Sequence, residues 1–226
     1  MIDMPNIYRY ILSLILICGL GLVDIQAQED DFQIWGDVSA KYKINKKIRV
    51  SGELGLRSRE NSQFLKQSYA EFGVKYKINK RFVLGSKYRY ADYYYQSKTP
   101  AHRFSFDAAY NVKWKRIRFT VRERYQQTWY ISDFKNKYDV KELRSRFMLT
   151  YDIKKSKIEP FMSMEHYLGL SGKYYLSTAQ NRWTLGLEFP VSKFSSLQIA
   201  YRIGKYGYYS IPATIYMFLI SYQIIL

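Results

Sequence analysis

Two histidines are the only imidazole bases in the chain, so they are the first candidates for catalysis. His102 precedes Ser105, and His166 lies in a later segment. Nucleophilic catalysis needs a hydroxyl and a base on one surface, with a third group that orients the base. If the chain around His102 is extended, residues 102 and 105 point to opposite faces, and the pair is poorly arranged. A hydrolase of lipid or lipopolysaccharide with His102 or His166 as its base stays open as an alternative function. The other interpretation is that both histidines are interfacial side chains.

Carboxylates form the second set of candidate catalytic groups, because two of them can work as a general acid and a general base. The candidates are Glu53, Glu71, Asp107, Glu142, Glu165 and Glu188. A basic set falls on the same face of the same extended segments, namely Arg49, Arg57, Arg103, Arg122, Arg124, Arg144, Arg146, Arg182 and Arg202. Because guanidinium groups pair with carboxylates and keep them ionised, we expect an ion-paired interior in preference to an active site. The excess of basic groups would also attract anions and repel cations.

The sequence predicts no cofactor and no metal site, because it has no Cys or His pairs at ligand spacing and no glycine-rich phosphate loop. Lys and Arg number 36 against 19 Asp and Glu, which gives a formal net charge of +17. Such a charge would suit nucleic acid. The basic residues are spread along the chain at alternate positions and do not cluster, so we do not expect a nucleic-acid partner.

The first 27 residues read as a signal peptide. Arg9 is followed by an apolar run of about 14 residues and then by Ile25-Gln26-Ala27, which has a small residue before a cleavage point. We therefore predict a signal peptide over 1–27 and one domain over 28–226; an uncleaved membrane anchor is the alternative. The single cysteine, Cys18, lies in the apolar run and would be removed with it, so no thiol chemistry is expected in the mature chain.

The segments that carry the charged residues alternate between apolar and polar side chains. In the first of them Phe32, Ile34 and Val38 alternate with Gln33 and Asp37. Eleven such runs cover 32–44, 48–58, 68–78, 82–93, 102–114, 117–128, 140–153, 158–168, 181–191, 197–205 and 214–226. A period of two is that of a β-strand, and none of the runs has the period of a helix.

The hexapeptide Lys-Tyr-Lys-Ile-Asn-Lys occurs twice, starting at Lys41 and at Lys75. Each copy ends one run and begins the next, so we expect its asparagine to form a tight hairpin turn on one rim of the sheet. Short turns of this kind alternate with loops predicted to be longer, around Asn61, Ser97, Lys135, Gly172 and Gly207.

These features predict an all-β protein, a transmembrane up-and-down antiparallel β-barrel of about 10–12 strands with short periplasmic turns and longer extracellular loops. Aromatic residues recur at equivalent strand ends and predict a periplasmic rim made of Tyr42, Tyr76, Tyr110, Tyr151, Phe189 and Tyr222. The apolar face is too bulky to fill the interior of such a barrel, so we expect it to face lipid. A soluble barrel with its apolar face inward, binding an apolar ligand, is the further alternative.

Two details do not fit a regular bacterial barrel. Eleven runs is an odd number, whereas bacterial single-chain barrels have even numbers of strands, so either a strand is split or merged or the N-terminal segment crosses the lumen. Strict alternation also places Glu123 on the lipid face, where a charge is costly, unless a β-bulge turns it inward.

The chain resembles a family known as domain of unknown function 2490, predicted outer-membrane barrels of Bacteroidetes-type bacteria. The resemblance is carried by Trp35 and by the segments HRFSFDAAY, RFTVRERYQ, LRSRF and SKIEPFMSMEHY, which begin at residues 102, 118, 143 and 156. It implies a fold and the outer membrane of a Gram-negative bacterium as the location, but no activity. We therefore expect a porin-like barrel in contact with outer-membrane lipid and lipopolysaccharide, either a small anion-preferring pore or a structural barrel.

Overall fold

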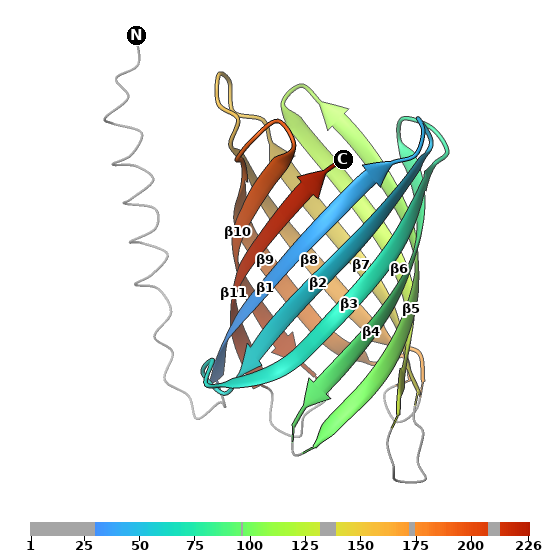
Figure 1. The fold of residues 1–226 in the computed structure, drawn as a ribbon, viewed down its shortest axis with the longest axis vertical. Coiled ribbons are helices and arrows are strands. Elements are labelled where there is room, and N and C mark those ends of the chain that lie inside the picture. Colours follow the sequence, from blue (N-terminus) through green and yellow to red (C-terminus); the bar gives the residue numbers. More distant parts are fainter. Residues whose placement is uncertain (1–29, 96, 132–138, 172–174, 208–212) are drawn as a thin grey trace, which may run out of the picture.

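The computed structural model describes residues 30–95, 97–131, 139–171, 175–207 and 213–226. The predicted signal peptide lies outside the described residues. Eleven strands are described, and Figure 1 shows that they form one tilted barrel. Their bounds are β1 Asp30–Lys43, β2 Ile48–Arg59, β3 Phe64–Lys77, β4 Phe82–Tyr94, β5 Lys98–Trp114, β6 Ile117–Tyr130, β7 Asp139–Tyr151, β8 Glu159–Gly169, β9 Thr178–Pro190, β10 Ser195–Tyr206 and β11 Ala213–Ile225. In this part of the chain, no helix is long and apolar enough to cross a membrane.

The barrel closes through a parallel pair. Consecutive strands are antiparallel neighbours, and β1 also pairs with β11 in the parallel direction, with Trp35 opposite Leu219. The predicted all-β barrel is thus confirmed, and each of the eleven runs corresponds to one described strand. Both explanations of the odd number are wrong: no run is split or merged, and β1 is part of the wall. A parallel ladder lets an odd number of strands close without leaving an unpaired edge.

The beginning of β1 is held by side chains from the end of β2 and from the β2–β3 turn. Direct pairing with β2 starts only at Trp35. Before it, the Ile34 amide donates to Ser58 Oγ at 2.6 Å, and the Phe32 amide donates to Asn61 Oδ1 at 3.2 Å. The Asn61 amide in turn donates to Asp31 Oδ1 at 2.8 Å. These bonds satisfy backbone groups of β1 that face β2 before the β1–β2 ladder begins.

The two faces of the strands have opposite character. Large apolar side chains point outward, such as Leu54, which is 65% exposed, and Phe147, which is 55% exposed. Polar side chains such as Gln33 and Gln67 point inward and are each 1% exposed. The alternative with the apolar face inward is therefore wrong for the described strands. The pairing of β6 with β5 and β7 is regular around Glu123, so no bulge turns this residue inward, and it lies exposed on the outer face.

The repeated hexapeptide forms the same turn twice. Asn45 Oδ1 accepts hydrogen bonds from the amides of Lys47 and Ile48, both at 2.8 Å. Asn79 Oδ1 accepts from the amides of Arg81 and Phe82 at the same distances. The side chain thus replaces a backbone acceptor in each β-hairpin, as predicted, and both turns lie on one rim, called the short-turn rim below.

Two connections at the opposite rim are shorter than predicted. β3 begins at Phe64, so the chain turns within residues 60–63, and β5 begins at Lys98, before the run that was expected from residue 102. The β2–β3 turn does so with Glu60, Asn61 and Ser62 all at positive φ. Strict alternation of apolar and polar residues is absent from the first residues of β3 and β5, whereas the backbone pairing includes them, and this is why the sequence pattern underestimates these strands.

Candidate functional site

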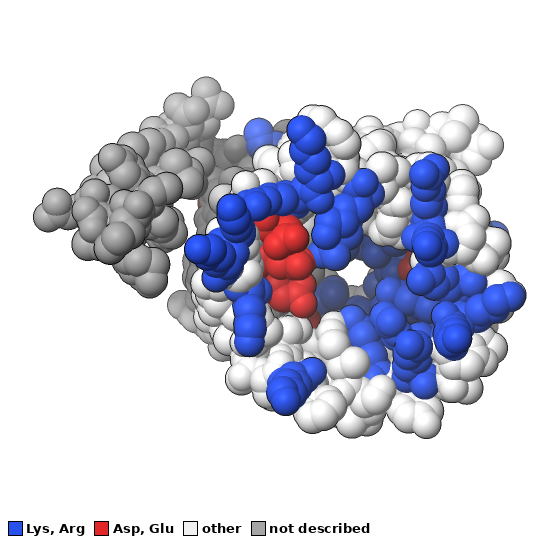
Figure 2. All heavy atoms as spheres, turned by 90° about the horizontal axis from the view of Figure 1, so that it is seen from above, with Lys and Arg blue, Asp and Glu red and all other residues white. Residues whose placement is uncertain are grey.

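The barrel encloses a polar lumen of about 590 Å³, to which every strand contributes. Figure 2 shows an opening at the short-turn rim that is bordered mainly by Lys and Arg. The basic lining residues are Lys41, Arg49, Arg57, Lys66, Lys75, Lys87, Arg89, Arg103, Arg122, Arg124, Arg144, Arg146, Arg182 and Arg202. The acidic lining residues are Asp37, Glu53, Glu142, Glu165 and Glu188. All nine arginines of the predicted basic set thus line this lumen, with a clear excess of positive charge.

Asp107 and Arg124 form a bidentate ion pair on the inner face of the wall. They are direct partners in the β5–β6 ladder. Arg124 Nε donates to Asp107 Oδ1 at 2.5 Å, and its Nη2 donates to Oδ2 at 2.7 Å. Both residues are buried, and the bidentate geometry is the strongest that a guanidinium and a carboxylate can form.

Glu165 is the centre of a larger network. Its Oε1 accepts from Arg122 Nη2 at 2.5 Å, and its Oε2 accepts from Arg144 Nη2 at 2.9 Å and from the Tyr167 hydroxyl at 2.9 Å. One carboxylate on β8 therefore joins side chains of β6 and β7 inside the wall. Arg144 Nη1 extends the network by donating to Gln126 Oε1 at 2.8 Å.

Glu71 is held in a similar way by β4. Arg89 Nε donates to Glu71 Oε2 at 2.7 Å, and Lys87 Nζ pairs with Oε1. Glu53 accepts from the Tyr69 hydroxyl at 2.8 Å. Glu71 and Asp107 are buried in the wall beside the lumen, whereas Glu53 lines it.

Three other arginines surround Trp35 and have no carboxylate partner. The guanidinium carbons of Arg57, Arg182 and Arg202 lie 4.0, 5.3 and 5.7 Å from the centroid of the Trp35 ring. No described residue forms an ion pair with any of the three within 4.0 Å. In addition, the Nε atoms of Arg57 and Arg182 are buried and make no hydrogen bond to the described residues. Three cations face the same ring, which stabilises them through its negative face but does not neutralise them.

Neutral oxygens orient two of these arginines. Arg182 Nη1 donates to the Tyr167 hydroxyl at 2.6 Å, and Arg202 Nε donates to Thr184 Oγ1 at 2.8 Å. The guanidinium groups are therefore fixed in position while they keep their full charge. We call Trp35, Arg57, Arg182 and Arg202 the tryptophan–arginine cluster.

An apolar cluster adjoins the tryptophan–arginine cluster, and two of its residues, Trp35 and Leu219, line the lumen. It consists of Trp35, Phe161, Ala200, Ile215, Met217 and Leu219. Sequence reasoning missed it because the last strand was expected to have one polar face like the others. The signal was present in ATIYMFLISYQII, where Ile215, Met217 and Leu219 stand at the inward positions.

A family model for proteins of unknown function, DUF2490, matches residues 32–205. The chain belongs to this family. No curated protein matches the chain. Membership in DUF2490 agrees with the resemblance noted in the sequence and supplies no activity. The described part of this DUF2490 barrel contains no group of His, Cys, Asp and Glu that could hold a metal ion.

The remaining predicted lumen residues have separate partners. Arg103 donates to Thr128 Oγ1 and to the Tyr93 hydroxyl, both at 3.0 Å. Glu142 accepts from Gln126 at 2.5 Å, and Arg146 Nη2 lies 3.0 Å from Met148 Sδ. Arg49 and Glu188 also line the lumen of the DUF2490 barrel, on strand segments near the short-turn rim. The structure thus brings the predicted charges together but divides them into paired and unpaired groups.

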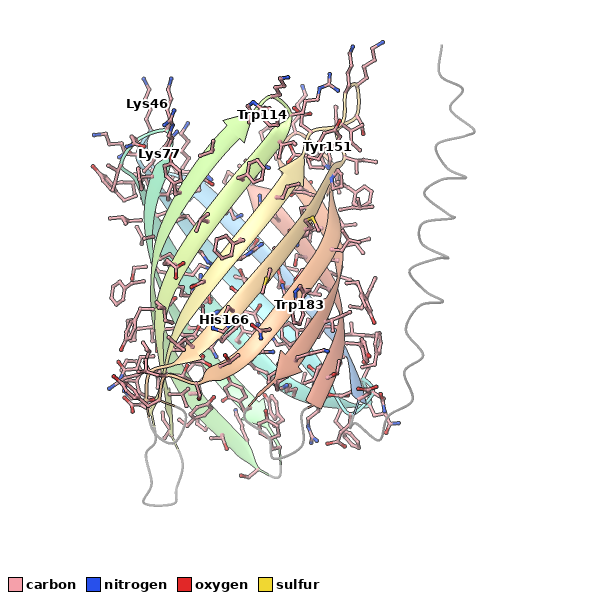
Figure 3. All side chains as sticks on the ribbon, turned by 180° about the vertical axis from the view of Figure 1, so that it is seen from behind. Lys46, Lys77, Trp114, Tyr151, His166 and Trp183 are labelled. Atoms are coloured by element: carbon pink, nitrogen blue, oxygen red, sulfur yellow. The ribbon has the colours of Figure 1, made fainter. Side chains whose placement is uncertain are left out.

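The predicted aromatic rim lies on the outer face near the short-turn rim. Tyr42, Tyr76 and Tyr151 are exposed there, and the ring of Tyr110 lies 4.7 Å from that of Phe82. Figure 3 shows Tyr151 and Trp114 at this end of the DUF2490 barrel. Phe189 and Tyr222 both flank Leu197 in the β9–β10–β11 ladders. The six positions therefore form one girdle on the outside of the barrel.

Both histidines lie on the outer face, away from the lumen. His102 Nδ1 is 2.7 Å from the Tyr88 hydroxyl and packs against the Tyr90 ring. His166 Nδ1 is 2.7 Å from Asn181 Oδ1. Ser105 points into the wall interior and is 3% exposed, so it does not face His102, in agreement with the sequence-based expectation.

Proposed function

We propose that this DUF2490 barrel lies in the outer membrane of a Gram-negative bacterium and provides a narrow pathway that prefers small anions. The observation that carries this proposal is the tryptophan–arginine cluster, in which three guanidinium groups share a wet lumen without a carboxylate partner. Fixed positive charge in a confined lumen lowers the energy of anions and raises that of cations.

The outer face supports a membrane location. Phe72, Phe106 and Leu185 are each more than half exposed, and similar side chains cover most strands. Water-exposed apolar area of this extent is unfavourable, whereas contact with lipid chains removes the cost. The described strands run for 11 to 17 residues, which is long enough for tilted strands to cross the apolar layer. We propose outer-membrane lipid and lipopolysaccharide as the partners of this surface.

The dimensions of the lumen support slow passage of small solutes. The cavity of about 590 Å³ is lined by long Arg and Lys side chains. Trp35 and Leu219 of the apolar cluster also line it. A dehydrated anion would gain hydrogen bonds from Arg57 and Arg182, whose Nε atoms are otherwise unsatisfied. Passage would therefore depend on a site that attracts anions and still releases them.

The test is a planar-bilayer measurement on the purified full chain with a gradient of potassium chloride. We expect small currents whose reversal potential has the same sign as the equilibrium potential of chloride. Membrane fractionation and heat-modifiable gel migration should place the folded protein with the outer membrane. A folded barrel without conductance, a cation preference, or recovery as a soluble periplasmic protein would each contradict the proposal.

A further inference from the structure

A row of polar residues crosses the otherwise apolar outer face of the barrel. In the β6–β7–β8–β9–β10 ladders Glu123 is opposite Ser145, Ser145 is opposite His166, His166 is opposite Asn181, and Asn181 is opposite Lys205. Residues opposite each other in an antiparallel ladder have Cβ atoms about 5 Å apart on one face. Five polar side chains from five strands are thus immediate neighbours, although their sequence positions are far apart.

Asn181 forms the hydrogen bond that orients the His166 ring. Its amide Oδ1 lies 2.7 Å from His166 Nδ1 and can only accept a hydrogen bond. With this acceptor, His166 Nδ1 is the donor, and in the neutral tautomer with a proton on Nδ1 the Nε2 atom has a free lone pair. Because β8 lies between β7 and β9, a ring whose Nδ1 faces Asn181 on β9 directs Nε2 toward the β7 side, where Ser145 lies. This is the orientation that a general base needs when a third residue holds it.

Ser145 stands directly opposite His166 in the β7–β8 ladder, although its hydroxyl has a different partner. In the structure its hydroxyl donates to Glu123 Oε2 at 2.7 Å. Rotation about one side-chain bond turns the hydroxyl from β6 toward β8 and His166. Hydrogen bonds of this kind often form only when a substrate is bound. Ser145 and His166 are both partly exposed, so a substrate can approach them from outside the barrel.

We propose that Ser145, His166 and Asn181 form a lipid-facing esterase site. Ser145 Oγ attacks the carbonyl carbon of an acyl ester, and its proton moves to His166 Nε2. The bond between that carbon and the ester oxygen then breaks, and the departing alcohol takes the proton from His166. Water, deprotonated by His166, releases the carboxylic acid from Ser145 and restores the hydroxyl. Asn181 is a positioning residue, since it acts through the ring of His166.

The neighbouring side chains suit an amphipathic ester. Phe147, Met164 and Trp183 form the adjacent outward row, and each of them is at least 40% exposed. They offer an apolar surface for an acyl chain, whereas exposed Lys205 at the end of the polar row offers a positive charge to a phosphate. The substrate class is therefore an acyl ester of an anionic lipid. Figure 3 shows His166 and Trp183 in the wall, well away from the rim that carries Tyr151.

His102 is a natural control for this site. Like His166, it lies on the outer face and forms one short hydrogen bond, which joins its Nδ1 to the Tyr88 hydroxyl. Its neighbours across the ladders are Tyr90 and Trp129, so no hydroxyl of a serine stands opposite it. The two histidines thus share an environment but differ in the presence of a nucleophile.

The experiment uses the full chain in detergent micelles with a p-nitrophenyl acyl ester and, separately, a fluorophosphonate probe. We expect the probe to modify Ser145 and Ser145→Ala to abolish both labelling and hydrolysis. His166→Gln should lower hydrolysis by about 100-fold or more, since a general base contributes this much, while His102→Gln should leave it unchanged. Asn181→Ala should lower kcat with little change in KM, because it disturbs the orientation of His166 and leaves the ester-binding surface intact, whereas Asn181→Asp should restore part of the rate.

Two lipid substrates then identify the natural source of the ester. Vesicles of phosphatidylethanolamine and phosphatidylglycerol test glycerophospholipid, and purified lipopolysaccharide tests acylated saccharide lipid, with release of fatty acid as the readout. Activity on either substrate that requires Ser145 supports the site. A folded, heat-modifiable barrel that neither reacts with the probe nor hydrolyses any of the three esters overturns it. Conductance is independent of these outer-face residues, so failure here and failure of the pore are separate results.

Discussion

Arginine side chains occur in two regions of the lumen. They have carboxylate partners in one region and none among the described residues in the other. In the paired region Arg122, Arg124 and Arg144 each bind a carboxylate within 2.9 Å. In the tryptophan–arginine cluster, Arg57 and Arg202 share one indole ring and no described carboxylate neutralises them. The first region joins adjacent strands to one another, whereas the second leaves positive charge facing the cavity.

The difference separates the charges that join strands from those to which our proposal assigns anion binding. A buried carboxylate that keeps its guanidinium partners has little reason to bind anything else, because its lone pairs are already used. Unneutralised guanidinium groups lower the free energy of an anion that enters. For the arginines of these two regions the expected role thus follows from the partner, although the residue type is the same in both.

The largest effect that would test this comparison is loss of the carboxylate at the centre of the paired region. Glu165→Ala removes the carboxylate partner of both Arg122 and Arg144 and leaves two largely buried charges unpaired, so we expect the free energy of unfolding to fall by about 3 kcal/mol. Urea unfolding in detergent or lipid measures it. The matched control is Glu159→Ala at the rim, where Arg118 Nη2 lies 2.7 Å away but the side chains are 47% and 36% exposed. That change should lower the free energy of unfolding by about 0–1 kcal/mol. Equal losses for Glu165→Ala and Glu159→Ala would contradict the structural role of the paired region.

An intermediate effect should follow from removing charge in the tryptophan–arginine cluster. Replacing Arg57, Arg182 and Arg202 by Gln should lower the preference for anions over cations by about tenfold, because the focusing field is lost. The reversal potential in a salt gradient measures the preference.

The control for this change removes the same charge outside the lumen. Lys46, Lys47 and Lys80 are exposed on the turns of the short-turn rim, and their replacement by Gln should alter the reversal potential much less. Equal shifts in the two variants would mean that the net charge of the barrel decides selectivity and that the tryptophan–arginine cluster does not.

The smallest effect is expected at the turns, which belong to neither region and provide a baseline for both. Asn45→Ala and Asn79→Ala each remove a side-chain acceptor of two amides, so each should cost about 1 kcal/mol of stability. The same unfolding assay measures it, with Lys46→Ala as the neighbouring control. Unequal costs for the two asparagines would show that the repeated hexapeptide does not have the same role in both places.

Much of this barrel follows from patterns that are local in the sequence. Alternation with a period of two separates the face of Phe72 and Leu54 from that of Glu71 and Arg57, because successive side chains of a strand point to opposite sides. The turn at Asn45 is equally local, since the asparagine bonds to amides two and three residues ahead. Strand number, face and the position of the short turns could be predicted for this reason.

The sequence by itself thus determined which residues share a face, but the tertiary structure decided which of them meet. The parallel β1–β11 seam, the pairing of Arg122 with Glu165 and the alignment of Ser145 with His166 each depend on the register between segments distant in the chain. A shift of one strand by two residues would preserve every alternating pattern and change all of these contacts. Register is set by the backbone ladders and closure of the whole barrel, and no single segment of the sequence contains that information.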